Sequence, residues 1–110
     1  MMTTDQQRAI LEAAAKACGI TGTFDDGICW FKHRDTGLLA PWTPLTNPAD
    51  TASMCAKLEI DTVWFNGFHV TCGDDRTGRH SAQPQDHDNS SLKAWMFAAT
   101  MVAAKIGDLK

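Results

Sequence analysis

Three side chains that could ligate a metal ion lie in one polar stretch of the chain: Cys72, His80 and His87. Thiolate and imidazole groups are the ligands that zinc prefers, and a structural zinc site uses four of them. None of the four cysteines, at positions 18, 29, 55 and 72, belongs to a Cys-x-x-Cys pair, which is the usual local signature of zinc and redox sites. The cysteines are better explained as small apolar residues, at least two of them buried. A metal-binding module or metal-dependent enzyme built on this stretch is therefore the alternative hypothesis.

The same stretch supplies the residue types of a hydrolytic triad in Ser81, His87 and Asp88. A nucleophile needs a base that is held in place and a rigid turn, and a loop of this polar composition promises neither. Two carboxylate pairs, Asp25-Asp26 and Asp74-Asp75, lie next to glycine, where aspartate is favoured by turn hydrogen bonding alone. Glycine-rich phosphate loops, nucleophile elbows and His-Glu-x-x-His are absent from the sequence. We predict a protein that is not an enzyme, with no catalytic, cofactor-binding or metal-binding residue assigned.

Five residues are candidates for contact with a partner protein. Trp64 and His69 are expected on the same face of a hairpin, where a helix should cover them; if that face is open, they would form a partner-binding patch. Arg76, Arg79 and His80 form a small basic group in the polar stretch, and arginine on an adaptable loop is suited to an acidic partner.

Length and charge narrow the class of protein. The chain of 110 residues, with 44% hydrophobic and 21% charged residues, is typical of one compact domain spanning residues 1–110. Ten Lys and Arg against thirteen Asp and Glu give a net charge of −3, which disfavours direct nucleic-acid binding. The apolar runs are far shorter than the roughly 20 residues of a membrane span, and the first residues lack the features of a signal peptide. We expect a cytoplasmic protein without a membrane partner.

Three segments carry the start signals and apolar spacing of helices. Thr4 and Gln7 fit a capping box, Pro48 follows Asn47 as a first helical residue, and a serine at position 90 or 91 begins the last helix. Apolar residues recur at steps of three and four after each start. The predicted helices are Thr4 to Cys18, Pro48 to Lys57 and Ser91 to Ile106, with Gly107 ending the last.

Residues that favour β-structure predict a strand and a hairpin. Bulky side chains on both faces of Ile28 to Phe31 predict a covered strand. Asn66-Gly67 has the residue types of a two-residue type I′ turn, which predicts a hairpin over Thr62 to Cys72 with Trp64 opposite His69. One apolar face of that hairpin would contain Val63, Phe65, Phe68, Val70 and Cys72. Beyond it, Gly73 to Asn89 is polar and predicts a long surface loop or an extension of the hairpin.

A resemblance to a known family enters at the second helix start. An aromatic-x-Pro segment leads into the helix at Trp42-Thr43-Pro44-Leu45-Thr46-Asn47-Pro48-Ala49-Asp50, followed by Leu58-Glu59-Ile60, the Asn-Gly hairpin and an alanine-rich closing helix. In this order, from Trp42 to Gly107, the chain resembles the NinX-like family of small bacteriophage proteins, described as a phage helix-sheet-helix (ABA) sandwich. The resemblance implies an accessory phage or prophage protein and brings no established catalytic residues. Many small phage proteins of this size disable host defence machinery, including CRISPR complexes.

These observations predict one α+β domain with a small, mostly antiparallel sheet formed by Ile28 to Phe31 and the hairpin. The three helices are expected to pack on the faces of that sheet. Its open edges would invite pairing with a second copy, so a homodimer is compatible with the sequence. The leading functional hypothesis is a non-enzymatic phage accessory protein that binds a host protein, with a defence system such as CRISPR as the target.

Overall fold

The computed structural model describes residues 4–20, 22–25, 28–32, 39–65, 69–74 and 76–109. Helices and antiparallel strands are mixed along the chain, which confirms the predicted α+β class. The elements in chain order are α1 (Thr4–Cys18), β1 (Gly22–Asp25), β2 (Ile28–Lys32), β3 (Leu39–Trp42), α2 (Pro48–Leu58), β4 (Asp61–Phe65), β5 (His69–Asp74), β6 (Gly78–Ala82), the short 3-10 helix η1 (Pro84–Asp86) and α3 (Ser91–Asp108).

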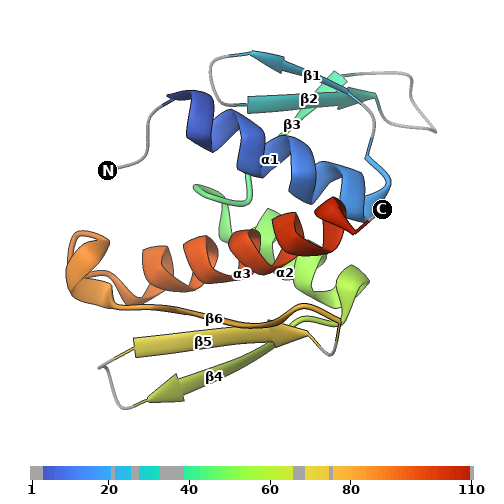
Figure 1. Cartoon of the computed structure of the whole chain (residues 1–110). Helices are drawn as coiled ribbons and strands as arrows, with labels where there is room; N and C mark the ends of the chain where they lie inside the picture. Colours follow the sequence, from blue (N-terminus) through green and yellow to red (C-terminus); the bar gives the residue numbers. More distant parts are fainter. Residues whose placement is uncertain are drawn as a thin grey trace.

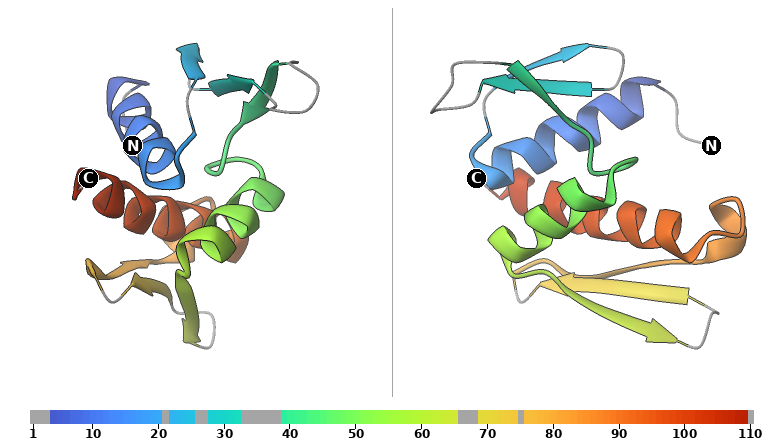
Figure 2. Two further views of the ribbon diagram at one scale, coloured as in Figure 1. Left: turned by 90° about the vertical axis from the view of Figure 1, so that its right-hand side faces the viewer. Right: turned by 180° about the vertical axis from the view of Figure 1, so that it is seen from behind.

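The strands form two separate sheets, with strand orders β1-β2-β3 and β4-β5-β6. The prediction that the strand at Ile28 to Phe31 joins the hairpin in one sheet is therefore wrong. The predicted order of layers is also reversed, because the helices lie between the sheets (Figure 1). α1 lies beneath the β1-β2-β3 sheet and packs on α3, while α3 covers the other sheet, with α2 beside it (Figure 2).

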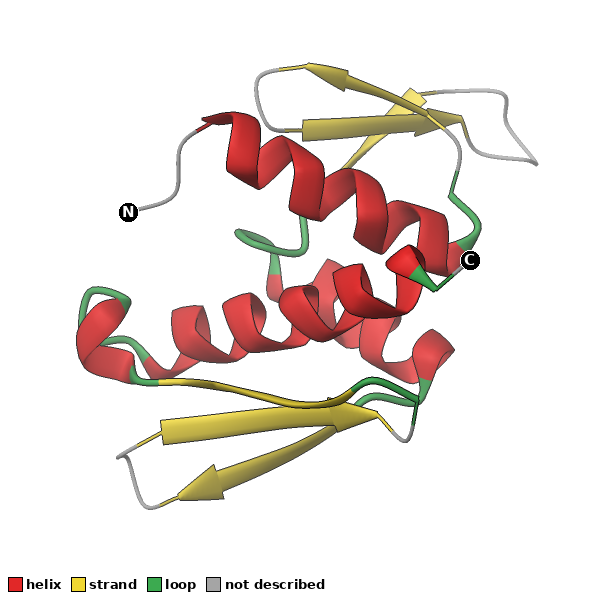
Figure 3. Cartoon of the chain, in the orientation of Figure 1, coloured by secondary structure: helices red, strands yellow, loops and turns green. Residues whose placement is uncertain are grey.

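Local capping explains where the helices begin. The side chain of Asn47 accepts a hydrogen bond from the Ala49 amide at 2.9 Å, and Ser90 accepts one from the Lys93 amide at 3.1 Å. Both satisfy amides that a first helical turn leaves free. The predicted bounds of all three helices hold to within about two residues, and these helices are coloured red in Figure 3.

Gly107 does not end α3 as predicted, because the helix continues to Asp108. A Cβ atom at position 107 would collide with the backbone of Ala13. Glycine therefore allows α3 to approach α1 more closely than any other residue would. Small side chains line the rest of this contact, where Ala14, Ala99 and Ala103 are fully buried.

The β4-β5-β6 sheet has a register one residue away from the prediction. Trp64 pairs with Val70 and Phe65 pairs with His69, whereas the two-residue turn would have paired Trp64 with His69. The residues of that turn lie outside the described part of the chain. Because side chains alternate along a strand, a shift of one residue exchanges the two faces. Val70 and Cys72 consequently share the inner face, toward α3, with Thr62 and Trp64 rather than with Val63 and Phe65.

The core lies where α3 meets α1 on one side and β5 on the other. Val70 and Cys72 of β5 are fully buried, as is Val102 of α3. Trp42 is also buried, and the burial of Cys18 and Cys72 confirms the prediction that at least two cysteines are buried. Among the described residues, no helix is both long enough and apolar enough to cross a membrane.

The polar stretch from Gly73 to Asn89 is an extension of the hairpin rather than a long loop. It contains the end of β5, the strand β6 and η1. β6 pairs with β5 along its whole length, from Gly78 opposite Asp74 to Ala82 opposite Val70. Its composition lacks the apolar alternation of a strand, and α3 covers only its inner side.

Candidate protein-binding surface

β4 is an edge strand with little cover from the helices. α3 packs over β5 and β6, and β4 diverges from the helical layer toward its carboxyl end (Figures 1 and 2). A hydrogen bond anchors the first half of β4 to α3: the Trp95 indole N–H donates to the Thr62 hydroxyl at 3.0 Å. Thr62 in turn contacts the Cys72 thiol at 3.6 Å on the neighbouring strand. The first half of β4 is therefore held in place and the second half projects outward.

Beyond this anchor, three consecutive apolar side chains are exposed. Val63 is 41% exposed, Trp64 52% and Phe65 44%. The expectation that a helix covers Trp64 is wrong, because β4 diverges from α3 toward its carboxyl end. Adjacent strand residues point to opposite faces, so both faces of this half-strand are apolar and open to solvent. We call Val63, Trp64 and Phe65 the β4 patch.

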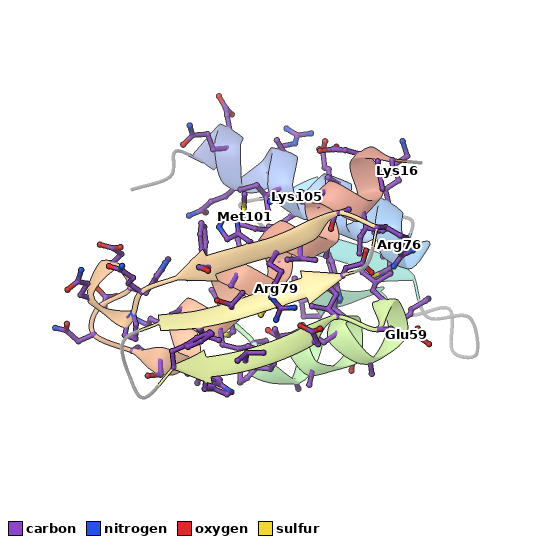
Figure 4. All side chains as sticks on the ribbon, turned by 60° about the horizontal axis from the view of Figure 1, so that its bottom comes forward. Lys16, Glu59, Arg76, Arg79, Met101 and Lys105 are labelled. Atoms are coloured by element: carbon purple, nitrogen blue, oxygen red, sulfur yellow. The ribbon has the colours of Figure 1, made fainter. Side chains whose placement is uncertain are left out.

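The outer face of the sheet, turned forward in Figure 4, carries a cross-strand ion pair beside the patch. Arg79 of β6 reaches over β5 to Asp61 of β4, with Nη2 and Oδ1 2.7 Å apart. Gly73 of β5 leaves room for this crossing, because a Cβ there would lie 2.7 Å from Nη1 of Arg79. Both partners are exposed, so the pair adds little stability. It does neutralise the single charged residue of β4.

Arg76 is engaged at the β5–β6 turn. Its guanidinium donates to Asp74 at 2.9 Å and to the Leu58 carbonyl oxygen at 3.2 Å. The hydrogen bond from Arg76 holds the pKa of the Asp74 carboxyl below its usual value. Arg76 therefore ties the turn to the end of α2, beside Glu59 (Figure 4). The predicted basic group is divided, since Arg76 and Arg79 are each neutralised by a different aspartate.

His80 and His87 both contact the ring of Phe97. The ring centroid of Phe97 is 5.7 Å from that of His80 and 4.7 Å from that of His87. Burial, with a smaller effect of Lys105, lowers the pKa of His80, so this residue adds no charge to a basic surface near neutral pH. Within the described part of the chain, no three His, Cys, Asp or Glu side chains form a group that could hold a metal ion. Cys72, His80 and His87 therefore do not come together as a ligand group in this structure.

The three residues considered as a hydrolytic triad have other partners. The Ser81 hydroxyl is hydrogen-bonded to Thr71 at 2.8 Å, His87 packs on Phe97, and Asp88 pairs with Lys93 at 2.8 Å. All three do line one cavity of about 1210 Å³, which opens between the first half of α1, the β3–α2 turn, the segment from the end of β6 through η1, and the start of α3. Its described walls mix buried apolar side chains with exposed polar ones.

The five predicted partner-binding residues do not form one surface. Trp64 belongs to the β4 patch, and the register places His69 opposite Phe65. Arg79 is on the outer face, and the other two lie at the turn and against Phe97. Val63 and Phe65 were expected on a covered face, so the prediction missed two members of the exposed patch.

Three of the edge strands, β3, β4 and β6, differ in residues that the sequence shows directly. β3 contains Pro41, which has no N–H for an added strand, and β6 contains Arg79 and begins at Gly78 with φ of +80°. Charge, proline and glycine are devices that keep edge strands from pairing with other chains. β4 has only Asp61 at its start, followed by four uncharged residues. Of these three edge strands it is the least protected, and its described side chains include an exposed apolar patch.

Comparison of the chain with protein-family models, with curated proteins and with solved structures found no match.

Proposed function

We propose that this protein is a non-enzymatic phage accessory protein that binds a host protein through the β4 edge. One observation carries the proposal: Val63, Trp64 and Phe65 are exposed in succession on an edge strand whose single charged residue, Asp61, is at its start. An unpaired strand edge offers backbone donors and acceptors to an extended segment of a partner, and neighbouring side chains give specificity. Aromatic residues are also the commonest anchors of protein interfaces.

The resemblance of residues 42–107 to small phage proteins supports the host-directed part of this proposal. Inhibition by binding needs a stable scaffold and a complementary surface and does not require catalytic groups. A bacterial defence complex such as a CRISPR effector is the target class that this origin suggests. The net charge of −3 favours a protein surface over a nucleic acid as the contact.

Affinity capture with β4 variants tests the binding surface. Tagged wild-type protein, Trp64→Lys and the control Ser53→Lys, at an exposed site on α2, are incubated with host lysate, and bound proteins are identified by mass spectrometry. We expect a stoichiometric host protein with the wild type and the control but not with Trp64→Lys. In reconstitution with the purified partner, Trp64→Ala should weaken binding by about 30-fold, as for an interface hot spot. A partner retained equally by all variants would show that β4 is not the interface.

A plating assay tests the target class. Expression of the protein in a host with an active CRISPR system should restore plaque formation by a targeted phage, and Trp64→Lys should not. If the wild type restores no plaques with any CRISPR type tested, the defence target is wrong, and the protein identified by capture replaces it.

A further inference from the structure

We propose that in the free protein the β4 edge pairs with β4 of a second copy, forming a two-fold symmetric dimer with one continuous six-stranded sheet. The inference goes beyond the proposed function, because it concerns the protein before any host partner arrives. The two β4 strands pair in antiparallel orientation, with Val63 of each copy at the two-fold axis. Val63 then lies opposite its own symmetry mate, Thr62 opposite Trp64 of the second copy, and Asp61 opposite Phe65 of the second copy.

Charge favours this arrangement over the parallel one. Asp61 is the single charged residue of β4, and in parallel register the two copies of it would be neighbours. When the antiparallel pair is centred on Val63, the two Asp61 carboxylates lie about 13 Å apart along the strands. This separation exceeds the screening length of about 8 Å at physiological salt, so the repulsion between these exposed charges is small. Each one is also paired with Arg79 of its own chain at 2.7 Å. The paired edges therefore meet without like charges in contact.

The other edge of the sheet explains why assembly would stop at two copies. After β4 pairs with itself, both ends of the six-stranded sheet are β6 strands. β6 has the sequence Gly-Arg-His-Ser-Ala, with Arg79 exposed and Gly78 in the left-handed region. Such an edge resists further pairing, so the two-fold contact closes on itself, as symmetric dimer interfaces do.

The exposed area of the β4 patch sets the expected strength. Trp64 and Phe65 are each about half exposed, and an aromatic side chain contributes about 150–250 Å² when fully buried. The apolar area available per copy is therefore well below the roughly 800 Å² per partner of a stable interface. We expect a weak, reversible dimer that a host protein could displace.

Sedimentation velocity over a wide concentration series tests the assembly. The wild type should shift from one copy to two as concentration rises. Val63→Lys places two ammonium groups across the two-fold axis and should remain a single copy at every concentration, whereas Ser53→Lys should behave as the wild type. Circular dichroism checks that each variant is folded. A wild type that stays monomeric, that grows beyond two copies, or that still dimerises as Val63→Lys would overturn the proposal.

Cysteine cross-linking tests the register with milder variants. Directly opposite residues of an antiparallel pair have Cα atoms about 4.5–5.5 Å apart, within the range that a disulfide spans. Val63→Cys should therefore give a disulfide-linked dimer on mild oxidation. Phe65→Cys should give none, because its symmetry mate lies about 13 Å away along the strands. Equal cross-linking of both variants would reject the register. A monomeric protein that still binds a host partner through β4 would leave the proposed function intact, and a dimer that binds no host protein would contradict only that function.

Discussion

β4 and β5 are neighbours in one sheet and have similar apolar residues, yet they have opposite surroundings. Val70 of β5 is fully buried, while Val63 of β4 is 41% exposed. Residue type does not explain the contrast, since both are valines. The faces do: Val70 is on the inner face, beneath α3, and Val63 is on the outer face, which α3 does not cover. Trp64 is the inner-face neighbour of Val70 on β4, and it is 52% exposed because α3 packs over β5 and β6 and reaches β4 through the Trp95–Thr62 hydrogen bond. β5 therefore belongs to the core, and the carboxyl half of β4 is available for contact with another molecule.

The largest effect should come from moving the helix that creates this contrast. Gly107→Ala puts a methyl group against the Ala13 backbone, so α3 must separate from α1 or shift on the sheet. Overpacking of this kind costs up to about 3 kcal/mol of the free energy of unfolding. Denaturant titration measures the loss, with Ala56→Gly at an exposed α2 position as a control that should cost about 1 kcal/mol. Equal stability of Gly107→Ala and wild type would show that α1 and α3 are far enough apart at Gly107 to accommodate a methyl group.

A matched pair of valine substitutions measures the contrast directly. Val70→Ala removes fully buried methyl groups and should lower the free energy of unfolding by about 2 kcal/mol. Val63→Ala removes partly exposed ones and should change it by about 0.5 kcal/mol or less in the monomer. Both values come from urea unfolding at a protein concentration below that of any self-association. If the two substitutions cost the same, the outer face at Val63 is covered and the distinction between the two positions fails.

Features set by short sequence segments were predictable, and features set by packing were not. The caps at Asn47 and Ser90 act on amides two or three residues away, so residue type sufficed to locate the helix starts. The alanine-rich faces of α1 and α3 suit contact either with a sheet or with another helix. Residue type does not say which contact forms, and the order of layers depends on it. The register depended on the length of the hairpin turn, and an error of one residue exchanged Val63 with Trp64 between faces.

The candidate site was predictable only in part for the same reason. Trp64 could be named from its residue type, because an exposed tryptophan on a hairpin is a plausible anchor. Val63 and Phe65 could not, since an apolar residue on a strand is buried or exposed according to whether a helix lies above it. The usable signal was the absence of charge, proline and glycine from Thr62 to Phe65, which distinguishes this edge from β3 and β6.

The smallest effect should be a pH dependence that reports on the covered side of the sheet. His80 lies on the inner face of β6, opposite Cys72 and against Phe97. Burial, followed by repulsion from Lys105, lowers the pKa of His80 from the ordinary value of 6.5. The unfolded chain therefore takes up a proton near pH 6.5 that the folded protein takes up only at lower pH. Linkage then requires this contribution to stability to be present above pH 6.5 and to decline as the pH falls toward the folded pKa.

Replacing the imidazole with a group that does not titrate isolates this contribution. His80→Gln should show a smaller loss of stability than the wild type between about pH 7.5 and pH 5, as measured by the urea midpoint at each pH. Ser53→Lys, remote on α2, should retain the wild-type dependence. A His80→Gln variant with the wild-type slope would mean that His80 is as well solvated in the folded protein as in the unfolded chain. The inner face of the sheet would then be exposed to solvent at β6 as well as at β4. The β4 and β6 edges would then differ only in the residues they contain.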